Sequence, residues 1–256
     1  MKTLSRHIHY GFSVSDKFKI FCAYIYLYVQ AKAGFLPSLS IKINFNFAQG
    51  RASFVITEIS DFWTIQDIFY DEQYRIRSSY VPKTILDLGS NIGISVVYFS
   101  LMYPNAHIYA FEPNKDAFKM LELHTKHLPQ VHLFNAALSN TDGMVDLYTS
   151  EHSTHGSLIA SHGIKQSVES VTLPKLLDRT GVAVFDFVKF DIEGAEDVLF
   201  EAIDVLKDTS VFVGEMHYDR MSLAAEDVAK FFPGYRKEEN FFKQKKRSII
   251  YIEKSV

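Results

Sequence analysis

Residues 84–95 read Thr-Ile-Leu-Asp-Leu-Gly-Ser-Asn-Ile-Gly-Ile-Ser, and this stretch decides the fold. Its first five residues form a short apolar run around Asp87, which is typical of a buried parallel strand. Gly89 and Gly93 permit a tight turn and a close backbone approach, and the residues after Gly93 follow a helical spacing. The stretch therefore predicts a strand, a glycine turn and a helix start, which together form a site for a nucleotide-like ligand.

A second strand pattern, residues 107–111, is followed by Glu112 and Pro113. An acid about 20 positions beyond the glycine turn is where such a unit binds ribose hydroxyls. Pro113 should end the strand and fix the turn, because its ring restricts the backbone. We therefore expect the carboxylate of Glu112 to be held at the edge of the sheet.

Two ligands suit this unit, a dinucleotide and S-adenosylmethionine. The dinucleotide fingerprint G-x-G-x-x-G uses its middle glycine to make room for a pyrophosphate. Here Asn91 occupies the tight position, where its side chain would crowd a pyrophosphate but could bind an amino-acid tail. Asp87 would repel phosphates and suit a sulfonium or ammonium group. The residues favour S-adenosylmethionine, with a nicotinamide-dependent oxidoreductase as the less favoured alternative.

The composition is that of an ordinary globular protein, with 47% hydrophobic and 22% charged residues among 256. The net charge of −3 gives no basic excess that would indicate a nucleic-acid partner. The single cysteine, Cys22, excludes an internal disulfide and a cysteine-based zinc site, and it is compatible with a cytoplasmic protein.

The N-terminus contains a continuous apolar run, residues 20–29, with lysines on both sides. A membrane span needs about 20 apolar residues, so this run is too short to cross a bilayer. We expect a helix that packs on the body or on a partner subunit, as in a homodimer. The alternative is a helix within residues 18–36 that rests on a membrane surface with its aromatic side chains at the interface.

The chain divides into a helical arm (1–38), a cap segment (39–82) and a cofactor-binding core (83–256). The cap should contain strands within 39–62 and a helix over 64–80. From residue 83 the alternation of strands and helices predicts an α/β fold with a mostly parallel seven-stranded sheet. Its strands are expected at 84–88, 107–111, 131–135, 185–190 and 210–216, followed by an antiparallel C-terminal hairpin at 234–238 and 247–253. Its helices are expected at 92–102, 114–127, 173–178, 194–205 and 222–231.

Five short motifs resemble the FkbM family of S-adenosylmethionine-dependent methyltransferases. They are Asp-Leu-Gly-Ser-Asn-Ile-Gly (87–93), Phe-Glu-Pro-Asn (111–114), Asn-Ala-Ala-Leu-Ser (135–139), Val-Thr-Leu (171–173) and Val-Lys-Phe-Asp-Ile-Glu-Gly-Ala-Glu (188–196), with Glu-Met-His (215–217) at a later strand end. The resemblance implies a Rossmann-like class I methyltransferase fold. It also implies O-methylation of a sugar or another small hydroxyl compound. The first 38 residues lie outside it.

The cofactor residues follow from the strand ends. We expect the methionine part to be surrounded by Asp87, Gly89, Asn91 and Gly93, and the ribose to be bound by Glu112 beside Pro113. The adenine should lie against Asn135, Ala136 and Ala137, where small side chains leave room for a flat base. Asp191 should face the methyl group and is counted with both the cofactor and the catalytic residues.

Lys189, Asp191 and Glu193 are expected on one side of the fourth strand's end, where unpaired charges would be costly. They could form a catalytic cluster or only brace the turn. His217 closes the fifth strand, so Asp191 or His217 is the expected base, with Glu193 as its orienting partner. No residue is assigned as a metal ligand, although the carboxylates could instead hold a divalent cation that chelates two sugar hydroxyls. His152, His155 and His162 are irregularly spaced in a polar segment and are not expected to form a metal site.

These observations predict an enzyme of glycan biosynthesis, or one acting on another small molecule, that transfers a methyl group to a hydroxyl. A second hypothesis keeps the fold without the catalysis: a silent subunit recruited to a membrane or an assembly by its aromatic N-terminal helix. The acceptor itself carries no transferable motif.

Overall fold

The computed structural model describes residues 2–33, 36–149, 156–157, 164–242 and 246–255. A central seven-stranded sheet has the order β12-β13-β11-β10-β3-β4-β5. Neighbouring strands from β11 to β5 are parallel, and β13 is antiparallel to both β11 and β12. This confirms the predicted fold class. The strands are β3 (Thr84–Leu88), β4 (His107–Phe111), β5 (Val131–Phe134), β10 (Phe187–Phe190), β11 (Val211–His217), β12 (Tyr235–Phe242) and β13 (Arg247–Lys254).

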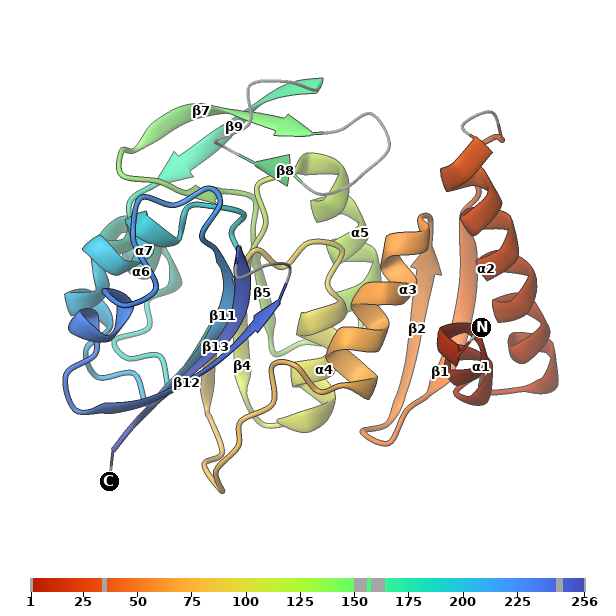
Figure 1. The fold of residues 1–256 in the computed structure, drawn as a ribbon, viewed down its shortest axis with the longest axis horizontal. Coiled ribbons are helices and arrows are strands. Elements are labelled where there is room, and N and C mark those ends of the chain that lie inside the picture. The colour runs from red at the N-terminus through yellow and green to blue at the C-terminus, as the bar shows by residue number, and fades with distance from the viewer. Residues whose placement is uncertain (1, 34–35, 150–155, 158–163, 243–245, 256) are drawn as a thin grey trace.

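Helices cover both faces of this sheet (Figure 1). Alternate residues of a strand point to opposite faces, so Ile85 joins one apolar cluster and Leu86 the other. The first cluster includes residues of α4 (Ile94–Met102) and α5 (Lys115–Thr125). The second includes residues of α6 (Leu173–Thr180), α7 (Glu196–Glu201) and the 3-10 turns η2 (Ile203–Leu206) and η3 (Val228–Phe231).

The N-terminal segments add further layers outside α4 and α5, on the right of Figure 1. They are α1 (Lys2–His9), α2 (Val14–Ala33), the antiparallel pair β1 (Ile41–Asn46) and β2 (Arg51–Ile56), α3 (Ile59–Ile65) and the π-helical turn η1 (Gln66–Tyr70). His124 of α5 ties them to the core: its Nε2 accepts from the N–H of Val55 at 2.9 Å, while Nδ1 lies 2.7 Å from the carbonyl oxygen of Ile92. The two regions share one apolar cluster, so the predicted helix packs on the body.

One face of α2 is buried and the other is apolar but exposed. Ile20, Ala23 and Leu27 are at most 1% exposed, whereas Phe18 is 68% and Phe21 47% exposed. Within the described residues, no helix has both the length and the apolar character required to cross a bilayer. The division into arm, cap and core stays a prediction.

Two predicted helices are wrong. The helix expected over 64–80 begins earlier, at Ile59, because the Asp61 carboxylate accepts the N–H groups of Thr57 and Glu58 at 2.7 and 3.0 Å. Its helical backbone ends at Tyr70, and Glu72 then adopts a left-handed backbone with φ of 49°. The helix expected over 222–231 is reduced to the four-residue turn η3.

A second, smaller sheet was not predicted. It has the order β6-β9-β7-β8, formed by β6 (Ala137–Leu138), β7 (Gly143–Thr149), β8 (Gly156–Ser157) and β9 (Ile164–Val171). β6 follows directly after the carboxyl end of β5, and Figure 1 shows β7 and β9 across the top of the central sheet. His152, His155 and His162 lie outside the described residues.

Candidate active site

The glycine turn after β3 contacts the chain that follows β10. Gly89 has a φ of +77°, and a Cβ atom there would lie 1.9 Å from the carbonyl oxygen of Asp191. Only glycine fits so close an approach without moving the backbone. The predicted cofactor turn and the predicted catalytic aspartate therefore belong to one site, and Gly89 is what allows them to meet.

The side chain of Glu112 is held by backbone N–H groups, one of which belongs to the same turn. One carboxylate oxygen accepts the N–H of Asn91 at 2.8 Å and the other accepts that of Asn114, also at 2.8 Å. The amide of Asn135 donates to the carbonyl oxygens of Glu112 and Pro113 at 2.7 and 3.1 Å, so it fixes this acidic turn. Burial raises the pKa of Glu112 to about 7, although the two backbone hydrogen bonds oppose that shift.

Lys189 and Asp87 form a fully buried ion pair below the turn. The Nζ atom of Lys189 lies 2.9 Å from the Asp87 carboxylate and donates to the carbonyl oxygen of Gly89 at 2.6 Å. Ser95 also donates to Asp87, at 2.6 Å. Lys189 therefore braces the turn by pairing with Asp87. Because Asp87 is neutralised, the argument that it would repel phosphates loses its basis, and its contact with the cofactor stays a prediction.

The carboxyl ends of β10 and β11 bring acidic side chains around the imidazole of His217. Its Nε2 atom lies 3.5 Å from a carboxylate oxygen of Glu193, 3.8 Å from one of Glu215 and 3.9 Å from one of Asp191. Its Nδ1 atom lies 2.9 Å from the buried carboxylate of Glu196. We call Asp191, Glu193, Glu215 and His217 the carboxylate cluster. The sequence prediction had placed three of these four residues in one site.

Charge interactions set the protonation of this cluster. Burial alone would lower the pKa of His217, but the hydrogen bond that it donates to Glu196 and the charges of Asp191 and Glu193 raise it to about 9. Burial and the neighbouring Asp191 raise the pKa of Glu215 to about 7. A histidine with this pKa carries its proton at neutral pH, so the carboxylates of the cluster, and not His217, are the groups able to accept a proton.

Several contacts of the site were not predicted. The hydroxyl of Tyr74 donates to Asp191 at 3.2 Å, and its ring lies 5.4 Å from Nζ of Lys189. Arg220 pairs with Glu193, and Arg247 lies 3.5 Å from Glu215. Tyr74 is separated from Asp191 by 117 positions, so no local pattern could have indicated the contact. The order of the parallel strands does predict that Glu215 lies near Asp191, because β11 lies beside β10.

The residues of the turn fit S-adenosylmethionine. Among the described residues, the buried Oδ1 atom of Asn91 has no hydrogen-bond partner, which leaves an acceptor for a donor of the ligand. Each oxygen of Glu112 accepts one backbone hydrogen bond and retains a lone pair for a ribose hydroxyl. Ala136 and Ala137 are buried beside this edge, and their predicted contact with the adenine stays a prediction.

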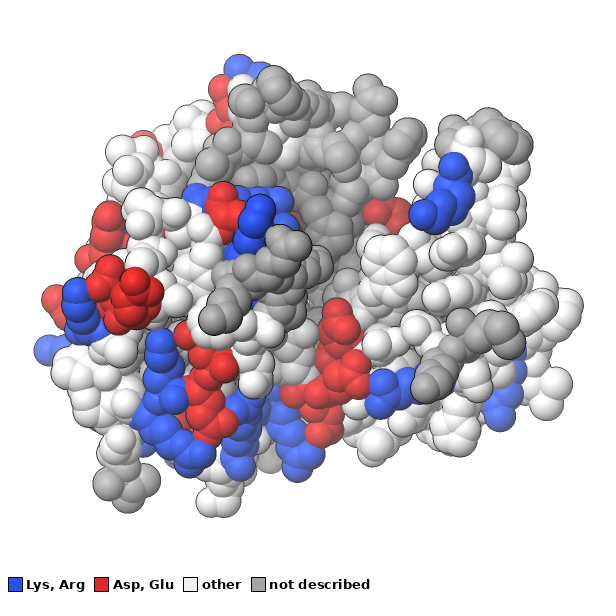
Figure 2. Space-filling model, viewed as in Figure 1, with Lys and Arg blue, Asp and Glu red and all other residues white. Residues whose placement is uncertain are grey.

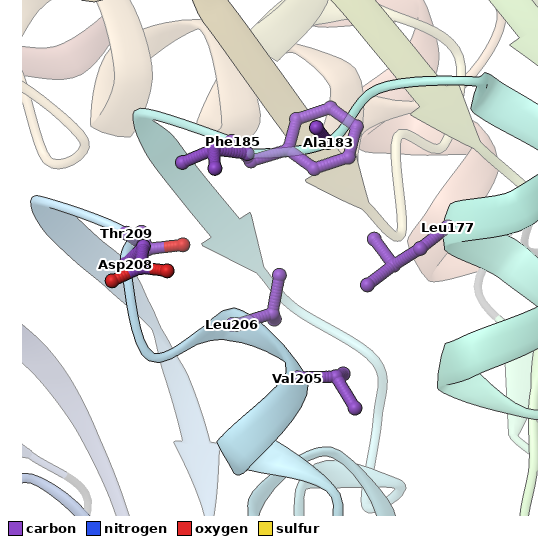
Figure 3. Close-up of a pocket in the computed structure, with 8 residues that line it drawn as sticks. Leu177, Ala183, Phe185, Val205, Leu206, Asp208 and Thr209 are labelled. Carbon is purple, nitrogen blue, oxygen red and sulfur yellow. The ribbon is translucent and has the colours of Figure 1, made fainter.

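A shallow depression lies at the opposite end of the strands (Figure 3). Phe185 and Thr209, which line it, precede β10 and β11, whereas the site residues lie at or just beyond the carboxyl ends of these strands. Ligands of open α/β sheets bind beyond the carboxyl ends of the strands. The depression is therefore not part of the candidate active site.

A parallel sheet with a glycine turn, a terminal acid on the second strand and an antiparallel last strand defines the Rossmann-like class I methyltransferases. The model of the Methyltransferase FkbM domain matches residues 87–255. The chain therefore belongs to the FkbM methyltransferase family, and its cofactor is S-adenosylmethionine. This confirms the resemblance and removes the dinucleotide alternative.

Two curated proteins are similar to this chain. The hexuronic acid methyltransferase AglP of Haloferax volcanii is 24% identical over 171 residues, which cover 65% of this chain and 70% of that protein. The AMB antimetabolite synthetase AmbE of Pseudomonas aeruginosa is 34% identical over 83 residues, which cover 31% of this chain and 4% of that protein. Among solved structures, TYW2 of M. jannaschii in complex with AdoMet has a TM-score of 0.47 at 15% identity and covers 86% of this chain and 89% of its own.

Proposed function

We propose that this methyltransferase acts on a hydroxyl group of a sugar, either free or within a glycan precursor. The observation that carries the proposal is the carboxylate cluster, which meets the cofactor turn at the contact between Gly89 and Asp191. Clustered carboxylates bind hydroxyl groups as hydrogen-bond acceptors, and they would repel an anionic acceptor atom. The similarity to a hexuronic acid methyltransferase supports a sugar as the acceptor.

The protein must align the acceptor oxygen and remove its proton. S-adenosylmethionine supplies an activated methyl group when bound. Asp191 stands next to the turn and is fixed by Tyr74, so we expect it to position the hydroxyl. Alignment of the reacting atoms is worth several kcal/mol, up to about 7–11 in favourable models. The proton passes to the carboxylate cluster as the new bond forms, a step worth about 10²–10⁴ in rate.

Methyl transfer from labelled S-adenosylmethionine to extracted glycans, followed by mass detection, tests this proposal. We expect a labelled sugar whose fragments carry the methyl group on a hydroxyl oxygen. Label on a nitrogen or on a protein side chain would contradict it. Binding of S-adenosylhomocysteine without any transfer would instead favour the silent subunit.

We also infer that the exposed face of α2 recruits the enzyme to an anionic membrane surface. Phe18, Phe21 and Ile25 are 68%, 47% and 44% exposed and recur at helical spacing. Lysines occur at both ends of the helix, and its one acid, Asp16, is buried beneath Ser13 and Asn44. Apolar residues flanked by lysines favour binding in the plane of an anionic surface. Flotation with vesicles of anionic and neutral lipid tests this inference, and binding to neither would contradict it.

A further inference from the structure

We infer that Asp191, Glu215 and His217 form a binding site for one divalent cation of the Mn²⁺ type. Each of the three offers one ligand atom, and these atoms lie within 4.8 Å of one another. The inference rests on the proposed function, because it places the cation where the acceptor hydroxyl reacts.

The first argument is the position of the imidazole. His217 is fully buried, and in the part of the chain that the structure describes its Nε2 atom has no hydrogen-bond partner. The ligand oxygens of Glu215 and Asp191 lie 3.8 and 3.9 Å from it, which is long for a hydrogen bond. Atoms that bind one cation at about 2.0–2.2 Å lie about 3–4 Å apart. The spacing therefore suits ligands of a shared cation better than hydrogen-bonded partners.

The second argument is the orientation of His217. Its Nδ1 atom faces the buried carboxylate of Glu196 at 2.9 Å. A histidine that binds a metal through one ring nitrogen usually donates from the other to a carboxylate, which fixes the ring and raises its basicity. Glu196 provides that partner and is a positioning residue in this proposal.

The third argument is charge. Two arginines reach the cluster, Arg220 at Glu193 and Arg247 at Glu215. A cation at Nε2 would displace the proton of His217. With His217 neutral, four carboxylates against two guanidinium groups leave a net charge of −2, which one divalent cation would balance. The carboxylates are Asp191, Glu193, Glu196 and Glu215. Imidazole with carboxylates favours a first-row ion such as Mn²⁺ over Ca²⁺, which prefers oxygen ligands alone.

The cation would stabilise the negative charge that develops on the acceptor oxygen. In this step the oxygen–carbon bond forms and the carbon–sulfur bond breaks, with its electron pair remaining on sulfur. The hydroxyl proton passes to Glu193, the carboxylate of the cluster that lies outside the three ligands. Glu193 has a left-handed backbone with φ of 54°, a strained conformation that is often found at functional sites.

Titration of Mn²⁺ followed by electron paramagnetic resonance tests the site without any methyl transfer, because bound Mn²⁺ loses the sharp signal of the free ion. We expect one bound ion per wild-type chain and at least about tenfold weaker binding in Glu215→Gln, His217→Asn and Glu196→Gln. Glu201→Gln, an exposed carboxylate on α7, is the matched control and should bind as the wild type does. Thermal unfolding of each variant shows whether it is folded.

Glu215→Gln keeps the test decisive should His217→Asn fail to fold. Wild-type protein that binds no Mn²⁺, or folded variants that all bind as tightly as the wild type, would overturn the inference. Sugar methylation that continues at the same rate in the presence of a chelator would also contradict the cation site, and it would support the proposed function. Mn²⁺ binding without any sugar methylation would support the cation site and contradict the proposed function.

Discussion

The two sides of the active site differ in how their charges are balanced. On the cofactor side, Lys189 pairs with Asp87, and Glu112 accepts two backbone N–H groups. On the reaction side, several carboxylates converge on His217 at distances of 3.5–3.9 Å. Buried charges are costly unless they are paired. The charged groups of the cofactor side are therefore paired or hydrogen-bonded within the chain, whereas the reaction side has more carboxylates than positive charges.

Asp191→Asn should have the largest effect, and it acts on the reaction side. The amide keeps the shape of the side chain but loses the charge that positions the acceptor hydroxyl, so methyl transfer should fall by about 10²-fold or more. Labelled transfer to the glycan acceptor measures the rate, and calorimetry with S-adenosylhomocysteine should show unchanged cofactor binding. Asp204→Asn, at an exposed position, is the control. Equal rates in Asp191→Asn and wild type would favour the silent subunit.

Lys189→Met tests the cofactor side through stability. It leaves the buried Asp87 without its partner, so the free energy of unfolding should fall by about 3–5 kcal/mol. Urea unfolding measures the change. Lys230→Met removes the partner of Asp227 in an exposed pair and should cost less than about 1 kcal/mol. Equal losses in the two variants would show that the buried pair is not what holds the turn.

The cofactor side was also the more predictable one. The apolar run of 84–88, the glycine turn and the strand before Glu112 are consecutive in sequence, so local pattern determines their geometry. The pairing of Lys189 with Asp87 was not predicted, because it joins neighbouring strands that lie about a hundred positions apart. The strand-end rule placed Asp191 and His217 together, since the ends of adjacent parallel strands meet at one edge.

The segments around the reaction side escaped prediction for physical reasons. Residues 73–80 were predicted as part of a helix, but Tyr74 and Ile76 alternate with polar residues and are both buried against the core. The antiparallel pairing of β7 with β9 was missed because a polar segment separates the two strands in the sequence and each sets the register of the other. Arg220 and Arg247 reach the cluster from a turn and from the last strand, and their sequence neighbours give no sign of it.

Glu112→Gln tests the cofactor side through its affinity for the cofactor. The amide cannot accept two ribose hydroxyls as a carboxylate does, and hydrogen bonds to charged groups are worth about 1.5–3 kcal/mol. We therefore expect binding of S-adenosylhomocysteine to weaken about 10–100-fold. Glu122→Gln, an exposed acid on α5, should bind like the wild type. Unchanged affinity in Glu112→Gln would mean that this acid does not bind the ribose.

The pH dependence of binding should follow Glu112. Because burial raises its pKa to about 7, the free protein carries a neutral acid below that pH, and the cofactor must then displace the proton. Affinity should fall by up to about tenfold per pH unit below 7 and level off above it. Calorimetry between pH 5.5 and 8.5 measures this, with Glu112→Gln expected to flatten the profile. A wild-type affinity that is constant across the range would contradict the assignment.

The same pKa predicts the sign of a stability effect. The folded protein retains a proton on Glu112 up to about pH 7, whereas the unfolded chain loses it near pH 4.5, the ordinary pKa of a glutamic acid side chain. The folded state therefore binds more protons in this window, and the contribution of Glu112 to stability is present below pH 4.5 and is lost as the pH rises towards 7. Wild-type and Glu112→Gln unfolding curves at several pH values should differ in this direction.

The smallest effect on folding is expected at the exposed face of α2, which is white with a few blue side chains at the right of Figure 2. Phe18→Ser with Phe21→Ser changes side chains that are 68% and 47% exposed, so the unfolding free energy should change by about 0.5 kcal/mol or less. Leu27→Ala, on the buried face of the same helix, should cost about 2–5 kcal/mol. The serine pair should nevertheless abolish flotation with anionic vesicles. Retained flotation, or a dimer that the serine pair dissociates, would assign this face to a partner copy instead of a membrane.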